Sequence, residues 1–269
     1  MRRILLGGLL LVTFALGQPG TCQTKLEPGI SCQAFTVQLA DFESRAELIY
    51  PSNAGQALPT VLLVHAGYPS DLDGTFNEDG KLISRNLLTI AEYLSKQGFA
   101  VARYNKRYVK NADDVDSSRY EQLGITDFVS DAKTVLSTLL ENPRVDPKHL
   151  FIMGWSEGAL VSTRAALEFP GLRGVILMSP PVIIEGQDYG LLMPAKKLKQ
   201  PVLILQGSSD QITEAKFTLQ LEQAFAGNTD FTIRYYPGLR HGLGQDSEFS
   251  TIDAVPLHDL ETWLKQHSQ

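Results

Sequence analysis

The stretch Lys148–Ala166 reads KHLFIMGWSEGALVSTRAA. It begins with the apolar run Leu150–Met153, which is too short for a helix and unbroken enough to be a buried parallel strand. A G-x-S-x-G motif follows at Gly154–Gly158, and apolar residues then recur at helical spacing. A strand, a glycine-flanked serine and a helix in this order are typical of a nucleophile elbow, which exposes the serine hydroxyl at the carboxyl end of a sheet. The sequence therefore makes Ser156 a candidate nucleophile.

The motif alone does not decide this, since glycine and serine are common and often occupy ordinary strand-to-helix turns. The rest of the chain supplies the context. Strand patterns are expected at residues 35–39, 46–50, 61–64, 99–104, 174–178, 201–205 and 231–236. Helical patterns are expected at residues 82–97, 128–140, 214–225 and 254–267, the second of them capped by Thr126 and Asp127. The polar segment 105–124 is expected to be a long loop.

This alternation predicts an α/β fold: one domain over residues 35–269, with a mostly parallel sheet and helices on both faces. The first two strands alternate apolar and polar residues, so we expect them to be antiparallel and to lie at a sheet edge. Ligands of such folds bind outside the carboxyl ends of the strands. The functional residues should therefore be found where the strands end.

Three residues follow different expected strands in the order serine, acid, histidine. They are Ser156, Asp210 and His241. A serine hydroxyl becomes a good nucleophile when an imidazole takes its proton, and the imidazole needs a carboxylate to fix its tautomer. The order is the one found in α/β-hydrolases. The three positions together favour a catalytic triad over a chance G-x-S-x-G match.

Each assignment has competitors in the sequence. Among the histidines, His65 begins the turn after its strand, His149 precedes the central strand, and His258 and His267 are expected to be solvated on the last helix. Asp188 and Asp246 compete with Asp210 as the acid. Asp210 is preferred because it directly follows a strand.

An oxyanion hole needs two backbone N–H groups aimed at the developing charge. The first is expected from Glu157, whose carboxylate we interpret as offsetting the helix dipole. The second is expected from the turn after residues 61–64, from Gly67 in preference to Tyr68. We expect Tyr68 and Trp155, next to these groups in the chain, to contact the substrate. Neither a metal ion nor a cofactor is expected.

The N-terminus indicates export. Residues 1–17 combine two arginines, an apolar run and small residues at a cleavage position, as in a secretory signal peptide; an uncleaved anchor is the alternative. Residues 18–34 form an N-terminal segment with Cys22 and Cys32, for which we expect a disulfide in an oxidising compartment. The mature protein is therefore expected to be periplasmic or secreted, with no stable membrane anchor.

The charge of −6 and the lack of a basic block argue against nucleic acid as a partner. The sequence does not indicate an oligomeric state.

From about residue 35 the chain resembles α/β-hydrolase-fold serine esterases, in particular dienelactone-hydrolase-like and prolyl-oligopeptidase-like members. His65–Gly74 is similar to the H-G-S-G-P-x-D-R-D-G stretch of one bacterial esterase group, and Arg103–Arg107 to its R-Y-D-K-R. The chain departs from that pattern at Ala66, Tyr68 and Leu72. Dienelactone hydrolases proper use a cysteine nucleophile, whereas this chain offers Ser156.

The resemblance implies a serine hydrolase that cleaves carboxylic esters, with a small-molecule ester as its substrate, and the N-terminus adds the expectation of export. Residues 179–200 leave room for a small flap and not for a cap domain, which favours small to medium acyl groups. A peptidase or acyltransferase using the same triad is one alternative. A non-catalytic binding protein of the same fold is another.

Overall fold

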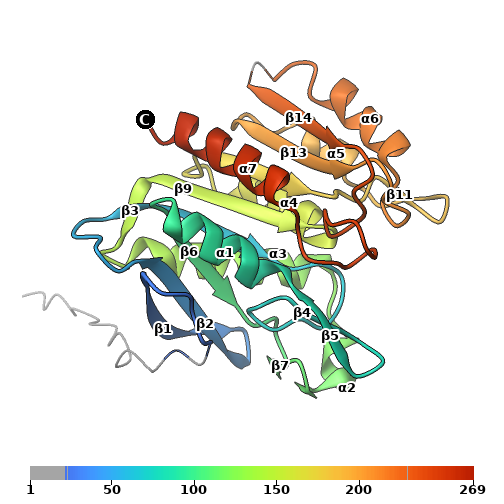
Figure 1. The fold of residues 1–269 in the computed structure, drawn as a ribbon. Coiled ribbons are helices and arrows are strands. Elements are labelled where there is room, and N and C mark those ends of the chain that lie inside the picture. Colours follow the sequence, from blue (N-terminus) through green and yellow to red (C-terminus); the bar gives the residue numbers. More distant parts are fainter. Residues whose placement is uncertain (1–21, 23, 229) are drawn as a thin grey trace, which may run out of the picture.

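The computed structural model describes residues 22, 24–228 and 230–269, and a central sheet organises it (Figure 1). The strands of this sheet lie in the order β1 (Ile30–Leu39), β2 (Phe42–Pro51), β6 (Ala100–Tyr104), β3 (Leu58–Val64), β9 (Val145–Trp155), β10 (Gly174–Met178), β13 (Val202–Gly207) and β14 (Phe231–Tyr236). β2 is antiparallel to both of its neighbours, and the other adjacent pairs are parallel. The prediction of a single α/β domain with a mostly parallel sheet is confirmed.

Helices cover both faces of this sheet. α1 (Asn86–Lys96) and α7 (Ala254–His267) lie on one face, and α3 (Ile125–Leu140), α4 (Glu157–Glu168) and α6 (Ala215–Ala224) lie on the other (Figure 1). Successive side chains of β9 serve the two apolar cores in turn. Phe151 and Met153 pack with α1 and α7, whereas Leu150 and Ile152 pack with α3 and α4. A strand buried on both faces needs apolar residues throughout, which explains its unbroken apolar run.

The helix expected from residue 82 is a correction to the sequence analysis. Its first residues form β5 (Lys81–Arg85), which pairs with β4 (Thr75–Glu78) in a hairpin, and α1 begins only at Asn86. Asp79 and Gly80 turn the hairpin with positive φ angles of 48° and 72°. Such consecutive left-handed residues suit a tight hairpin turn. Leu82 and Ile83 continue the apolar spacing of α1, so the sequence predicted a helix where β5 lies.

Residues 105–124 were expected to be a loop and contain short elements instead. These are β7 (Val109–Asn111), β8 (Asp114–Val115) and α2 (Ser117–Tyr120). Arg107 fastens the segment to α3 by two hydrogen bonds to Asp131, one of them 3.1 Å long. α3 begins at Ile125, earlier than expected, because the Asp127 carboxylate accepts the Gly124 N–H at 2.9 Å.

A small flap connects β10 to β13, as expected from the length of that segment. It consists of β11 (Ile183–Ile184), β12 (Gln187–Asp188) and α5 (Leu192–Ala195). Leu191 of this flap is fully buried, while Met193 is 64% exposed. Part of the flap is therefore an extension of the core.

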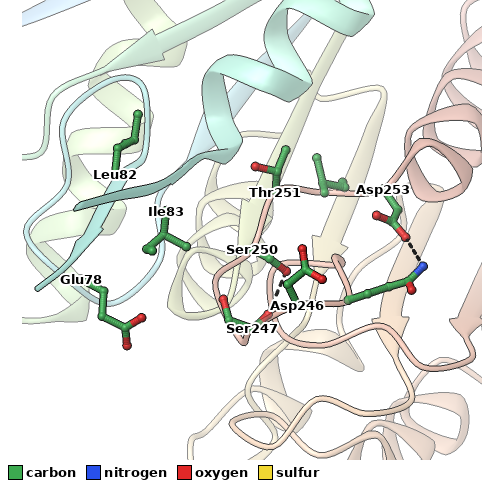
Figure 2. A pocket seen from close by; sticks show the side chains of 10 residues that line it. Glu78, Leu82, Ile83, Asp246, Ser247, Ser250, Thr251 and Asp253 are labelled. Carbon is green, nitrogen blue, oxygen red and sulfur yellow. Dashed lines mark hydrogen bonds between the residues drawn. The ribbon is translucent and has the colours of Figure 1, made fainter.

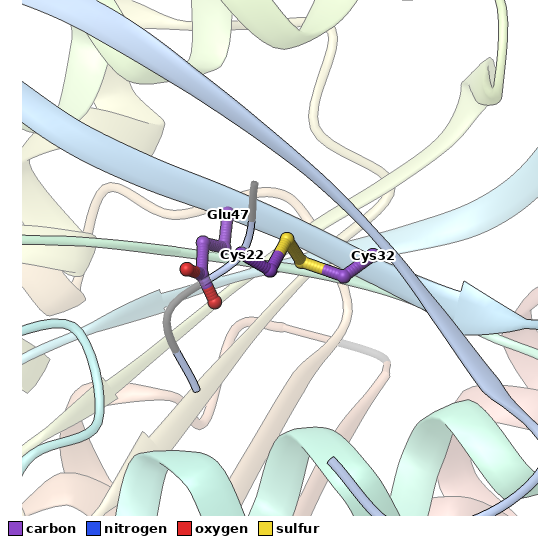
Figure 3. A group of neighbouring side chains, drawn as sticks. All are labelled: Cys22, Cys32 and Glu47. Atoms are coloured by element: carbon purple, nitrogen blue, oxygen red, sulfur yellow. A yellow bond between two sulfur atoms is a disulfide. The ribbon is translucent and has the colours of Figure 1, made fainter. Parts of the chain in front are cut away.

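A disulfide joins Cys22 to Cys32 with their Cα atoms 6.2 Å apart, so the expected bridge is present (Figure 3). The two sulfur atoms lie near Glu47, but they are bonded to each other and cannot act as thiolate ligands for a metal. Thr24 adds a hydrogen bond of 3.2 Å to Asp73. These contacts hold the N-terminal segment against the β1–β2 edge of the sheet. The proposed signal peptide, residues 1–17, lies outside the described residues.

Replacing both cysteines with serine is expected to lower the free energy of unfolding by about 2–3 kcal/mol, because the bridge closes a short loop in the unfolded chain. Hydrolytic activity is expected to survive, since three strands of the sheet separate β1 from β9. Denaturant unfolding and ester hydrolysis by the double variant measure both effects. An inactive but folded variant would contradict the separation of bridge and site.

Within the described residues, no helix is long and apolar enough to cross a membrane.

Candidate active site

The elbow lies between β9 and α4. Ser156 has φ 54° and ψ −123°, a strained conformation for a residue with a side chain. A Cβ atom at Gly154 would lie 2.0 Å from the Gly158 carbonyl oxygen, and one at Gly158 would lie 2.5 Å from that of Val64. Both glycines of the motif are therefore required by close approach of the backbone. The expected strand–serine–helix context is present.

The sheet fixes the position of this turn. Ser156 N–H donates to the Met178 carbonyl at 2.8 Å, at the end of the neighbouring strand β10. The serine is 8% exposed, and its hydroxyl makes no hydrogen bond to the described residues. The elbow thus holds a hydroxyl that is unengaged and close to the surface.

Asp210 and His241 form a buried pair after β13 and β14. The distance from His241 Nδ1 to Asp210 Oδ2 is 3.0 Å. The other carboxylate oxygen, Oδ1, accepts the N–H groups of Ile212 and Thr213 at 2.9 and 2.8 Å. Oδ2 also accepts the Thr213 hydroxyl at 2.7 Å and the Gln206 amide at 3.1 Å. A carboxylate in such a setting can orient an imidazole.

These contacts also determine the ionisation of Asp210. Burial acts to raise the pKa of this carboxyl, but the hydrogen bonds from His241 and Thr213 outweigh it, so the pKa lies below its usual value. Asp210 therefore carries its negative charge at neutral pH, next to the His241 ring. A base that must hold a proton during a reaction benefits from this arrangement.

The histidine backbone is fastened to the elbow. The Trp155 indole N–H donates to the His241 carbonyl at 3.1 Å, and the Ser179 hydroxyl donates to the same oxygen at 2.8 Å. Trp155 directly precedes Ser156, and its ring centroid lies 5.9 Å from that of His241. The structure thus places the three predicted residues after β9, β13 and β14, and it joins the Asp210–His241 pair to the residue that precedes Ser156.

The competing residues lie in other surroundings. His149 is inside β9 and bonded to Asp146, a correction to its expected place before the strand. His267 is also corrected: its side chain is 13% exposed and bonded to the Trp263 carbonyl, not solvated. His65 is buried against the Tyr104 ring. The other three competitors, His258, Asp188 and Asp246, are exposed.

The two expected oxyanion donors lie on adjacent elements. A Cβ atom at Gly67 would be 3.5 Å from Glu157 Cβ, in ordinary van der Waals contact. The turn after β3 and the start of α4 therefore meet at these two residues. The Glu157 side chain points into a polar cluster, where Oε2 accepts the Tyr189 hydroxyl at 3.1 Å. This contact ties the flap to the elbow.

A family model for the dienelactone hydrolase family matches residues 79–268. The chain belongs to the dienelactone hydrolase family. It is a hydrolase of the α/β-hydrolase superfamily, and membership implies a small-molecule substrate. The matched region includes Ser156, Asp210 and His241. The turn with Gly67 precedes it.

Solved structures similar to this chain support the same fold. A provisionally assigned dienelactone hydrolase from Klebsiella pneumoniae subsp. pneumoniae is 18% identical, with a TM-score of 0.68 over 89% of this chain and 99% of that one. A dienelactone hydrolase-like promiscuous phosphotriesterase from metagenomic libraries is 15% identical (TM-score 0.65, 89% and 98%). The dienelactone hydrolase from Anabaena variabilis is 16% identical (TM-score 0.64, 88% and 98%). No curated protein sequence matches the chain.

An aromatic wall stands beside the candidate triad of this dienelactone hydrolase family member. It consists of Tyr68, Phe76, Trp155 and Phe249, with ring centroids 4.1–6.3 Å apart. Phe249 also lies 5.7 Å from the His241 ring. Trp155 is 1% exposed, so its contacts are with the protein, and its contact with substrate stays a prediction. Tyr68 is half-buried and borders the site through this wall.

A pocket of about 630 Å³ lies beside the segment that follows His241 (Figure 2). The β4–β5 hairpin and the segment before α7 line it, and the candidate triad does not. Its charged lining residues are Glu78, Asp246 and Asp253, all acidic. Asp246, the weaker acid candidate, therefore belongs to this pocket and not to the pair with His241.

Two parts of the site were missed in the sequence. Thr213 donates to the carboxylate of Asp210 and lies 3.3 Å from His241 Nδ1. Lys106 lies buried behind Gly67 and Glu157, 2.6 Å from the Ala66 carbonyl. Nothing near Thr213 in the chain distinguishes it from other loop threonines. Lys106 belongs to the segment Arg103–Arg107, whose similarity to R-Y-D-K-R was noted, but the sequence did not indicate its contacts.

Proposed function

We propose that this hydrolase cleaves carboxylic esters of small to medium acyl groups through an acyl-enzyme on Ser156. One observation carries the proposal. The Trp155 indole N–H donates to the carbonyl of His241, which is paired with Asp210. Trp155 directly precedes Ser156, whose backbone is strained. Geometry of this kind is how a serine–histidine–acid triad is recognised on any fold.

In the proposed mechanism, Ser156 Oγ attacks the ester carbonyl carbon while His241 Nε2 takes the hydroxyl proton. The carbonyl oxygen becomes an oxyanion, which the N–H groups of Gly67 and Glu157 stabilise. The C–O bond to the leaving alcohol then breaks, and His241 returns the proton to that alcohol. Water, activated by His241, hydrolyses the acyl-enzyme and restores Ser156.

The flap supports the expected size of the acyl group. Tyr189 bonds to Glu157 at 3.1 Å, so the flap closes over the elbow from one side. The regular structure between β10 and β13 is a hairpin with two residues in each strand and one four-residue helix. A site with so small a roof suits a short acyl chain better than a long lipid chain.

Fluorophosphonate labelling tests the nucleophile. Only an activated serine reacts readily with such a probe, so one adduct is expected on Ser156 and none on Ser208 or Ser209, which follow β13. Peptide mapping by mass spectrometry locates the adduct. Heat-denatured protein is the control and should remain unlabelled. A label elsewhere on the folded chain would overturn the assignment.

The same preparation can be assayed on p-nitrophenyl esters of increasing acyl length and on peptide nitroanilides. Faster hydrolysis of short-chain esters is the result that the proposal requires. Preferential cleavage of nitroanilides would favour a peptidase, and transfer of the acyl group to an added alcohol would favour an acyltransferase. Binding without turnover would favour the non-catalytic alternative.

Export is part of the proposal. The Cys22–Cys32 disulfide supports it, because such bridges persist in oxidising compartments.

A further inference from the structure

A buried ammonium group lies behind the two candidate oxyanion donors. Lys106 follows β6 and is 4% exposed. Burying a lysine is unfavourable unless its charge is paired and its N–H groups are bonded, and an apolar side chain would fill the same space at lower cost. The proposed mechanism gives this lysine no role, so its burial needs a separate explanation.

The ammonium has three N–H groups and three oxygen partners. Nζ lies 2.6 Å from the Ala66 carbonyl oxygen, 3.1 Å from the Tyr120 hydroxyl and 3.5 Å from Glu157 Oε1. The Phe128 ring centroid lies 4.6 Å away and adds a cation–π contact. All donors of Lys106 are thus directed to the protein, and none is left for a ligand.

The Ala66 carbonyl belongs to the same peptide group as the Gly67 N–H. A trans peptide is planar, so its carbonyl and N–H point in opposite directions. An ammonium that fixes the carbonyl on the buried side therefore fixes the direction of the N–H on the opposite side. Ala66 is buried and Gly67 is exposed, in agreement with this orientation. The bond also polarises the peptide and strengthens the Gly67 N–H as a donor.

The same ammonium reaches the second donor residue. Glu157 supplies the other N–H, and its carboxylate is held between Lys106 and the Tyr189 hydroxyl. Gly67 and Glu157 are also close together, because a Cβ atom added to Gly67 would lie 3.5 Å from Glu157 Cβ. One cation therefore links the turn after β3 to the first residue of α4.

We propose that Lys106 is a positioning residue of the oxyanion hole, which holds the Ala66–Gly67 peptide and the Glu157 side chain so that both N–H groups converge on the developing oxyanion. The inference rests on the proposed serine hydrolase function. Lys106 acts through these two residues and does not touch the reacting atoms.

The proposal has a consequence for the pH dependence. Burial lowers the pKa of Lys106 to about 8, and the charge of Glu157 offsets this only in part. Above this pH the group loses its charge and one of its three donors. The activity of the wild type is therefore expected to fall as the pH rises through about 8.

The charged and titratable groups that face Lys106 are Glu157 from α4, Tyr120 from α2 and His65 from the end of β3. Burial raises the pKa of Tyr120 out of this range, and burial together with Lys106 lowers that of His65 to about 3. Tyr189, which bonds to Glu157, has a pKa raised by burial to about 12. None of these tyrosine and histidine shifts produces a transition near pH 8.

Deprotonation of Lys106 does not itself favour unfolding. The pKa of Lys106 in the folded chain is below its ordinary 10.5, so between about 8 and 10.5 the unfolded chain binds more protons than the folded one. For this group, stability increases with pH across that range. The loss of the Lys106 charge is therefore expected to lower activity without lowering the contribution of this group to stability.

The test compares Lys106→Met and Lys106→Gln with the wild type on p-nitrophenyl acetate. Removal of one oxyanion donor reduces kcat by about 10²–10³-fold, and we expect about 100-fold for Lys106→Met with KM changed less than threefold. Lys106→Gln keeps a donor for the Ala66 carbonyl and should regain part of the rate. The alkaline decrease near pH 8 should be absent in both. Lys110→Met makes the same change at an exposed lysine of the same segment, so it is the matched control and should keep a wild-type rate and pH profile.

Circular dichroism shows whether each variant is folded. A folded Lys106→Met protein with kcat within threefold of the wild type, or with the alkaline decrease retained, overturns the inference. So does a loss confined to KM. If Lys106→Met does not fold, the wild-type profile still decides, since a constant rate from pH 7 to 10 contradicts the role. A wild type that neither hydrolyses esters nor labels at Ser156 refutes the proposed function itself, whereas an active wild type with unaffected variants refutes only the role of Lys106.

Discussion

Ser156→Ala is expected to lower kcat for ester hydrolysis by on the order of 10⁴-fold or more, because the variant has no oxygen to attack the carbonyl carbon. His241→Ala is expected to cost about as much, since the serine then keeps its proton. The residues act as a unit, so the double variant should be no worse than the poorer single variant. Steady-state assays of the three proteins on one ester measure this.

A residual rate above that in water is expected in all three, because the N–H groups of Gly67 and Glu157 remain. Thermal melts must accompany the assays. Ser156→Ala is expected to fold, since its hydroxyl makes no hydrogen bond to the described residues. Folded single variants with wild-type rates would show that the triad is not used, and the binding-protein alternative would then account for the fold.

Asp210→Asn is the second substitution with a large expected effect. The asparagine oxygen can still accept the N–H groups of Ile212 and Thr213, so the loop should keep its shape. Its amide nitrogen, however, would donate toward His241 Nδ1 and select the tautomer that cannot take the serine proton. A loss of about 10⁴-fold in kcat is expected, as for the equivalent change in other triads.

Asp188→Asn and Asp246→Asn are the matched controls, with the same chemical change at exposed positions. Asp188 bonds to the nearby Gly190 N–H at 2.8 Å, and Asp246 lines the acidic pocket. Both should retain rates within a few-fold of the wild type. If either lost more activity than Asp210→Asn, the acid would have to be reassigned.

The fold could be predicted because the buried strands leave a strong signal. The second half of β9, from Leu150, and all of β10 are buried on both faces, so both are apolar runs. The hairpin β4–β5 could not be predicted in the same way. Leu82 and Ile83 continue the spacing of α1, although they belong to β5. The turn between β4 and β5 depends on two left-handed residues, Asp79 and Gly80, of which only the glycine is conspicuous in the sequence.

The candidate triad was predictable because each of its residues directly follows a strand, and the order along the chain restricts the choices. Thr213 and Lys106 were not, because their roles depend on contacts between distant segments. Lys106 meets the Ala66 carbonyl 40 residues away and Glu157 51 residues away. Pairing of charges across such separations depends on the final packing and leaves no periodic pattern.

The backbone at Ser156 has a consequence for protein engineering. A residue with a side chain at φ 54° destabilises the folded chain by about 1–2 kcal/mol relative to glycine. Selection for heat resistance alone would therefore favour loss of this serine, and with it any chemistry that depends on the hydroxyl. Such trade-offs between thermal stability and catalytic activity are concentrated at strained residues. A thermostable variant should be sought instead at exposed apolar positions far from the elbow, such as Leu140 and Leu219, where no strain is coupled to reactivity.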